Sequence, residues 1–238
     1  SELNLDGGSS ILIGGTFQGN VDMDPGPSVE YLNSGNSEDV FVLKLNSAGN
    51  FQWANQLGND NYESLNGLVT DNTGHAYVAL SFSDSLDADP GPGVSMVYSQ
   101  GYNDVLLAKY TPGGAFQWAK GIGGSGFDDP KGLCIDGGNT LFLTGTFEAS
   151  CDLDPGASVQ NLNSNGDYDL FVARYDAGGN YLFARQVGGS GADAFAGPGS
   201  RSQPVCPCGP SLLAGGLPGG ENVLRKGARG AGKVRSEN

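Results

Sequence analysis

The residues best suited to chemistry are three pairs of aspartates, each followed by Pro-Gly: Asp22 and Asp24, Asp87 and Asp89, and Asp152 and Asp154. In an extended segment, residues two apart point to the same side, so each pair presents two carboxylates together. Carboxylates and turn carbonyls are Ca²⁺ ligands, although Ca²⁺ prefers six to eight oxygens. The pattern predicts Ca²⁺ sites at these aspartates. The alternative is a plain Asp-Pro-Gly turn, in which the carboxylate accepts backbone N–H groups.

Signals for catalysis are weak. His75 is the only histidine, and the positions 65 residues before and after it hold Ser10 and Thr140. No Gly-x-Ser-x-Gly, His-Glu-x-x-His or phosphate-binding sequence occurs. Trp53 and Trp118 could stack on sugar, but they stand in an alternating apolar pattern that favours a core position. We therefore predict no catalytic residue, while a carboxylate pair for glycan cleavage stays an alternative.

These residues belong to a sequence that repeats every 65 residues without a gap. VDMDPGPS at 21–28 recurs as LDADPGPG at 86–93 and as CDLDPGAS at 151–158. FQWANQLG at 51–58 recurs as FQWAKGIG at 116–123 and as YLFARQVG at 181–188. Internal repeats of this kind indicate a repeat architecture. We predict one domain at 1–197, made of three units at about 3–67, 68–132 and 133–197.

Each unit contains about four short apolar runs that predict antiparallel strands. In the second unit they lie at 67–71, 75–82, 104–110 and 115–122, and a run at 94–97 could add a fifth strand. No segment has sustained helical periodicity. Four strands per repeat predict an all-β fold built of β-propeller blades. Three blades are too few to close a ring, so we expect an incomplete ring that self-associates through its open blade edges.

The strand motifs also carry a family resemblance. DVFVLKL at 39–45, followed by SAGNFQWA at 47–54 and by Gly58, resembles the bacterial SBBP-type β-propeller repeat. The resemblance covers 3–197 and implies a propeller, often seven-bladed, in secreted or surface proteins of bacteria. It thereby implies an extracellular or cell-surface location. The family has no established common activity, so the resemblance assigns no catalytic residue to this chain.

Charge divides the chain into an acidic body and a basic tail. Residues 1–197 hold 24 acids and 6 bases, and residues 198–238 hold 2 acids and 6 bases, which together give the net charge of −14. An acidic body argues against nucleic acid as a partner. No apolar run is long enough to span a membrane. The repeat stops at Pro198, and the Gly- and Pro-rich tail is predicted to be disordered or out of frame.

Two functions follow as expectations. The first is a non-catalytic repeat scaffold for adhesion or for binding a protein or glycan ligand, steadied by Ca²⁺. The second is a fragment of a propeller enzyme, a lyase or hydrolase that acts on glycans. Threefold equivalence of the polar residues favours the scaffold, because an active site needs unlike, non-repeating groups at one place.

Overall fold

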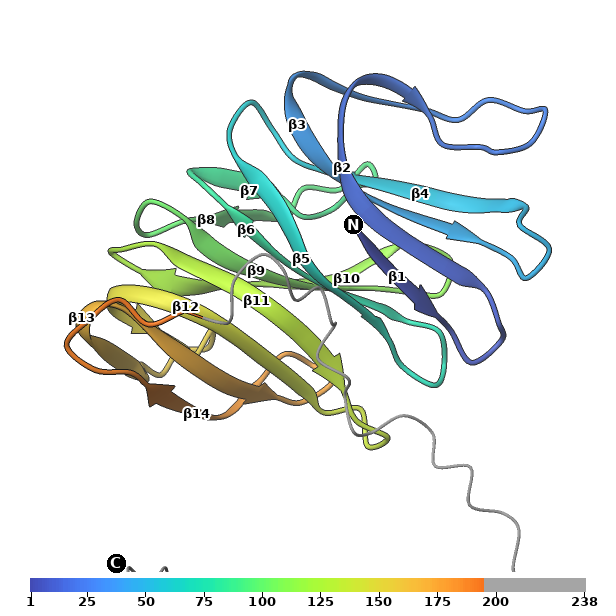
Figure 1. Ribbon diagram of the computed structural model, residues 1–238. Helices are drawn as coiled ribbons and strands as arrows, with labels where there is room; N and C mark the ends of the chain where they lie inside the picture. The colour runs from blue at the N-terminus through green and yellow to red at the C-terminus, as the bar shows by residue number, and fades with distance from the viewer. Residues whose placement is uncertain (195–238) are drawn as a thin grey trace, which may run out of the picture.

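The protein is all-β, as predicted. The computed structural model describes residues 1–194, and the tail predicted at 198–238 lies outside the described residues. Strands make up its regular structure, and no helix occurs in residues 1–194. The strands form three antiparallel four-stranded units in simple up-and-down order (Figure 1).

The units follow one another along the chain. Unit I contains β1 (Glu2–Leu5), β2 (Ile11–Asp22), β3 (Tyr31–Leu45) and β4 (Phe51–Leu57). Unit II contains β5 (Glu63–Thr70), β6 (Ala76–Phe82), β9 (Asp104–Tyr110) and β10 (Phe116–Gly124). Unit III contains β11 (Asp128–Ile135), β12 (Leu141–Asp152), β13 (Asn161–Tyr175) and β14 (Tyr181–Val187). Units II and III are also joined by a two-residue pairing of β10 with β12.

The first strand of a unit starts earlier than the repeat register indicates. We expected the second and third units to begin at 68 and 133, but β5 begins at Glu63 and β11 at Asp128. The additional residues pair with the end of the next strand, since Glu63 lies opposite Phe82 and Asp128 opposite Phe147. The acids at 63 and 128 are therefore part of the sheets and not of the loops between units.

The long connection between the second and third strands forms a hairpin in every unit. In unit II it is a separate hairpin of β7 (Ser85–Asp87) and β8 (Met96–Tyr98), close to the expected fifth strand. In units I and III the same segment continues β2–β3 and β12–β13 beyond a bulge. Gly19, Asp84 and Ala149 mark equivalent positions, and all three have positive φ. The backbone at this one position is therefore left-handed in all three units, while the strand pairing around it differs.

The sheets pack face to face, and apolar side chains fill the space between them. One cluster joins Leu12 and Val42 of unit I to Val78 and Leu80 of unit II. A second joins the other face of unit II to unit III. Strand β6 is consequently buried at every position, whereas residues of β13 alternate between more and less exposed. Residues 1–194 thus form an open stack of three sheets with unit II in the middle (Figure 1).

Candidate functional site

The aspartate pairs lie in the hairpin loops, and their carboxylates organise the loop backbone. In unit II, Oδ1 of Asp87 accepts hydrogen bonds from the N–H groups of Asp89 (3.1 Å) and Ser95 (2.8 Å). Oδ1 of Asp89 accepts one from Gly91 (2.9 Å). The loops of units I and III repeat this pattern, with Asp22 and Asp152 in the first role and Asp24 and Asp154 in the second. The hydrogen bonds of an Asp-Pro-Gly turn are therefore present, and Ca²⁺ binding at these six residues remains a prediction.

Each loop is also anchored to its own sheet. The residue between the two aspartates is buried in every unit: Met23, Ala88 or Leu153. The backbone N–H of this residue donates a hydrogen bond across the loop, as from Ala88 to the Ser95 carbonyl at 3.0 Å. In units II and III a buried tyrosine hydroxyl bonds to its carbonyl, from Tyr110 to Ala88 and from Tyr175 to Leu153, both at 2.9 Å. These tethers give the loop a fixed shape, which suits a binding surface.

An open cavity of about 440 Å³ lies between the loop of unit II and the edge of unit I. It is lined by Asn55, the segment 89–93 and the segment 113–116. Most of its wall is Pro, Gly and backbone, with the Asp89 carboxylate as its one charged side chain among the lining residues. Such a wall can bind a small polar or cationic group, and no nucleophile stands beside a base in it.

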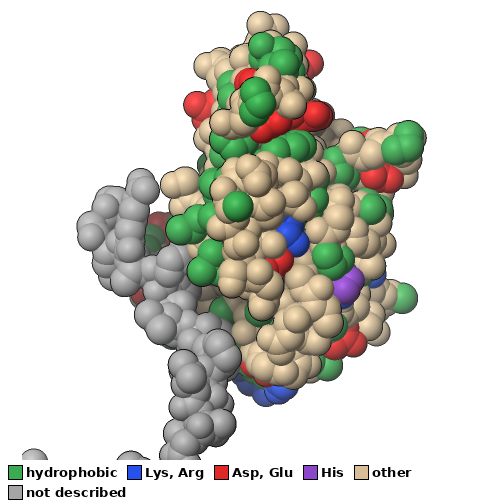
Figure 2. All heavy atoms as spheres, turned by 90° about the vertical axis from the view of Figure 1, so that its right-hand side faces the viewer, with side chains coloured by type: hydrophobic (Ala, Val, Ile, Leu, Met, Phe, Trp, Pro, Cys, Tyr) green, Lys and Arg blue, Asp and Glu red, His purple; other side chains and the backbone are tan. Residues whose placement is uncertain are grey.

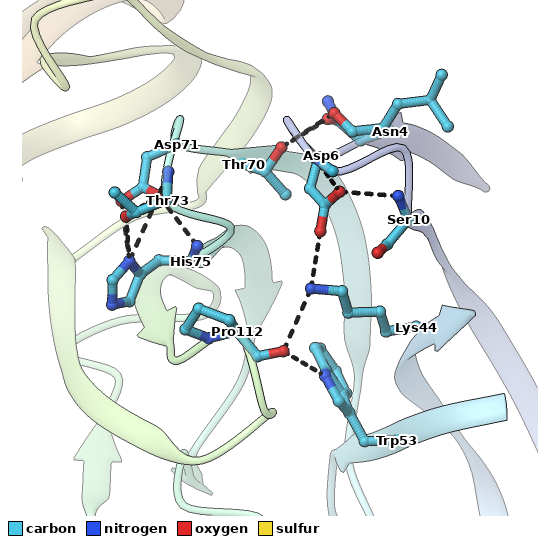
Figure 3. Close-up of polar contacts among 12 residues, drawn as sticks. Asn4, Asp6, Ser10, Lys44, Trp53, Thr70, Asp71, Thr73, His75 and Pro112 are labelled. Carbon is cyan, nitrogen blue, oxygen red and sulfur yellow. Dashed lines mark hydrogen bonds and ion pairs between the residues drawn. The ribbon is translucent and has the colours of Figure 1, made fainter. Parts of the chain in front are cut away.

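Successive units are held in place by a polar contact at the Pro112 turn (Figure 3). Nζ of Lys44 lies 2.9 Å from Oδ2 of Asp6 and donates to the Pro112 carbonyl at 3.2 Å. Nε1 of Trp53 donates to the same carbonyl at 2.9 Å. Burial opposes the charge of Asp6, but hydrogen bonds from Lys44, Ser10 and Gly8 outweigh it and lower the pKa of that carboxyl. Lys44 is thus paired with an acid, Asp6.

The tryptophans are half-buried, whereas we expected full core positions. Trp118 packs against the core between units II and III and meets the ring of Tyr77 edge-on, with centroids 6.2 Å apart. Its ring also lies against the turn of unit III at Gly179. Trp53 makes the equivalent contact with Gly114 of unit II. The repeated tryptophan therefore belongs to the contact between units, with part of its surface open to solvent.

The environment of His75 does not resemble a catalytic triad. Nδ1 of His75 contacts both the Thr73 hydroxyl (2.8 Å) and Oδ2 of Asp71 (3.2 Å), as Figure 3 shows. Activation of a hydroxyl nucleophile needs the hydroxyl at one ring nitrogen and the acid at the other. Oδ1 of Asp71 also accepts the N–H groups of Thr73 and His75. This cluster closes a strand turn.

Buried acid pairs between the units were not found by sequence reasoning. Asp39 and Glu63 face each other at the first junction, and Asp104 and Asp128 at the second; all four are at most 3% exposed. Burial, with a smaller effect of the Asp39 charge, raises the pKa of Glu63 to about 7. The signal was available, since acids stand at 63, 128 and 193, which are 65 residues apart. It was missed because the expected units began five residues later.

The cysteines and the other side chains that could bind a metal do not form a site of three or more ligands within residues 1–194. Cys134 is half-buried, Cys151 is fully buried, and neither forms a disulfide within residues 1–194, while Cys206 and Cys208 lie outside the described residues. Within residues 1–194, no group of three or more His, Cys, Asp or Glu side chains is placed to hold a metal ion. The same residues contain no helix that could cross a membrane.

The chain has a distant relative among known proteins. No family profile matches the chain, so the resemblance to the SBBP-type repeat stays an expectation from sequence. The chain is similar to an uncharacterised WD repeat-containing protein of Acanthamoeba polyphaga mimivirus. The match is 23% identical over 224 residues and covers 80% of this chain, but the chain spans only 16% of that relative. A repeat protein of the β-propeller kind is consistent with this match.

Proposed function

We propose that the three units are consecutive blades of a β-propeller that serves as a non-catalytic scaffold for binding protein. The observation that carries this proposal is the repeated loop, which has a fixed backbone and an exposed apolar tip. Val29, Val94 and Val159 occupy equivalent loop positions and are 57%, 76% and 65% exposed. An exposed valine next to an ordered acidic turn gives each unit the same contact surface, which suits an extended partner with basic and apolar residues.

The arrangement of the sheets and the relative support the architecture. Antiparallel four-stranded sheets with an apolar core on both faces of the middle one are the packing expected of adjacent blades. The relative is described as WD repeat-containing, and WD repeats form propeller blades. Figure 2 shows acidic and hydrophobic side chains together on the lobe that projects at its top, the position of the β2–β3 hairpin in Figure 1. Val29 and Tyr31 are the exposed apolar residues of that hairpin.

Two finer statements belong to the same proposal. The resemblance to bacterial SBBP-type repeats supports an extracellular or cell-surface location, which cell fractionation and surface labelling would test. The paired aspartates of the three loops support Ca²⁺ as a stabilising ligand, because their carboxylates lie at equivalent places in loops of the same shape. Each of these statements can fail without affecting the binding role.

A selection experiment tests the binding function. Peptides that bind the full chain are first selected from a displayed library. Their affinity for the chain should fall about tenfold or more when Val29, Val94 and Val159 of the chain are all changed to Glu. The control is Leu182→Glu, which adds a charge at an exposed residue of β14 far from the loops in sequence. Ligands that bind the loop variant and the wild type equally would contradict the proposed surface. Depolymerisation of a glycan by the purified chain would favour the enzyme alternative.

A further inference from the structure

The junction between units II and III buries two carboxylates side by side. Asp104 begins β9 and is 1% exposed, and Asp128 begins β11 and is fully buried. The residues just before them, Asn103 and Phe127, form a parallel bridge. The N–H of Asp128 donates to the Asn103 carbonyl at 2.8 Å. The backbone therefore fixes the two acids next to each other.

Each of these carboxylates has an oxygen without an N–H or O–H partner. Oδ2 of Asp104 accepts the N–H of Gln100 at 2.9 Å, and Oδ2 of Asp128 accepts the N–H of Gly124 at 2.6 Å. The Oδ1 atoms of both residues are buried and accept no N–H or O–H group, and the Cys151 thiol beside Asp128 is only a weak donor. Among residues 1–194, no Lys, Arg or His forms an ion pair with either acid. Two uncompensated charges at such a place would be strongly unfavourable.

Unit II lacks a hydrogen-bond donor that the other two units have. Nε2 of Gln56 donates to Oδ2 of Asp39 at 2.6 Å, and Gln186 donates in the same way to Asp169. The equivalent position in unit II is Gly121, which has no amide side chain. Asp104 therefore keeps the position of its counterparts but not their neutral partner. Comparison with Asp39 and Asp169 in the other two units therefore shows what Asp104 lacks.

The groups around the pair do not supply a positive charge. On β11 the next residue is Asp129, which contacts Lys131 (3.7 Å) and accepts the Ser81 hydroxyl of β6 (2.8 Å). On β12 the facing titratable groups are the fully buried Cys151 thiol, which lies against Asp128, and Asp152. The adjoining end of β10 is Ile122, Gly123 and Gly124, without titratable side chains, and β5 contributes Glu63 opposite the end of β6.

We propose that Asp104 and Asp128 together hold a proton at neutral pH, which makes the junction of units II and III a pH-sensitive contact. The proton removes one of two adjacent buried charges and lets one acid donate a hydrogen bond. A metal ion is the less suitable occupant, because two carboxylates supply too few ligands. The proposal concerns stability and goes beyond the binding function.

The electrostatics agree with the geometry. Burial raises the pKa of Asp104 to about 6. Burial, followed by the charge of Asp104, raises the pKa of Asp128 to about 8. Both values lie above the ordinary value of 3.8, so the folded protein binds protons that the unfolded chain releases. The stabilisation is complete below about pH 4 and is lost as pH rises through the folded values of about 6 and about 8.

Urea unfolding of the full 238-residue chain at several pH values tests this proposal. In the wild type, the unfolding constant should rise by up to about tenfold per pH unit for each proton released. Asp128→Asn imitates the protonated acid, since its amide oxygen still accepts the Gly124 N–H and its NH₂ can donate to Asp104. This variant should be more stable than the wild type at about pH 8 and should show a weaker pH dependence. Asp167→Asn, at an exposed acid of β13, should keep the wild-type dependence.

A direct measurement covers the case in which the variant does not fold. Carboxyl NMR of the wild type with ¹³C-labelled aspartate should show aspartates that titrate near pH 6 to 8, and Glu63 would not contribute. The absence of such signals would overturn the proposal, as would an Asp128→Asn variant with unchanged pH dependence. Millimolar Ca²⁺ that stabilises the wild type at about pH 8 but not Asp128→Asn would also overturn it, because the pair would then be a cation site.

Discussion

Replacing Gly114 with alanine should destabilise the protein more than the same change at Gly49. Both glycines occupy the same turn of the repeat, with φ of +85° and +81°. Alanine in this left-handed region costs roughly 1–2 kcal/mol at either position. A Cβ at Gly49 would meet nothing within 4 Å, whereas one at Gly114 would lie 2.7 Å from Cδ2 of Trp53 in the preceding unit. Overpacking adds roughly 1–3 kcal/mol, so Gly114→Ala should cost roughly 2–5 kcal/mol in all.

Urea unfolding of the full chain measures this difference. The two tryptophans of the sequence, Trp53 and Trp118, both stand at contacts between units, so their fluorescence reports on these contacts. Far-UV circular dichroism should give the same midpoint if unfolding is two-state. Gly179→Ala is a second case, since its Cβ would lie 2.9 Å from the Trp118 ring. It should fall between the other two variants or match Gly114→Ala.

A double variant separates crowding from backbone strain. Trp53→Leu has a smaller side chain, so Gly114→Ala should cost less in that background than in the wild type, while Gly49→Ala should cost the same in both. Equal losses for Gly49→Ala and Gly114→Ala in the wild type would refute the reasoning. They would mean that Trp53 does not press on the turn of unit II and that the two sheets do not stack in this way.

Three further predictions use the same unfolding assay. Tyr110→Phe should cost roughly 1–3 kcal/mol, because it leaves the carbonyl of buried Ala88 without its hydroxyl donor; a change below roughly 0.5 kcal/mol would mean that the tether is not formed. Millimolar Ca²⁺, but not Na⁺ at matched ionic strength, should raise the melting temperature, and Asp87→Asn with Asp89→Asn should reduce that rise; an unchanged temperature would contradict the calcium prediction. Asp6→Asn should cost roughly 3–5 kcal/mol at neutral pH by leaving Lys44 unpaired. Because the pKa of Asp6 is lowered, that cost should shrink as pH falls below about 3.8, and a pH-independent cost would argue against the ion pair.

The strands could be predicted well from the sequence, because each segment can be compared with its counterparts in the other two units. The expected strands at 75–82, 104–110 and 115–122 correspond to β6 (Ala76–Phe82), β9 (Asp104–Tyr110) and β10 (Phe116–Gly124). The repeat spacing also aligns Asp6, Asp71 and Asp136, and each of these carboxylates accepts the N–H groups two and four residues later. These features depend on local backbone geometry, which sequence spacing records directly.

Features that depend on contacts between units could not be read in the same way. The depth of Trp118 was overestimated, since alternation shows which face a side chain is on but not how far the next sheet covers it. The acid pair at Asp104 and Asp128 joins residues of two units, and nothing in either motif alone requires a partner across the junction. Both cases concern packing between sheets. The repeat shows which residues recur in each unit, but it does not show which residues of the next unit they contact.

The differences among the three units carry information that the repeat itself does not. Position 56 is Gln in unit I, Gly121 in unit II and Gln186 in unit III, and this single change removes the neutral partner of a buried acid. The surroundings of this position also differ, because a Cβ at Gly121 would lie 2.8 Å from Cγ1 of Val97 in the separate β7–β8 hairpin. The two glutamines donate to Asp39 and Asp169, whereas Asp104 of the middle unit has no such donor and lies beside a second buried carboxylate, Asp128 of unit III. A rise in pH should therefore weaken the contact between units II and III through Asp104 and Asp128, and the contact between units I and II through Glu63, whose pKa is about 7.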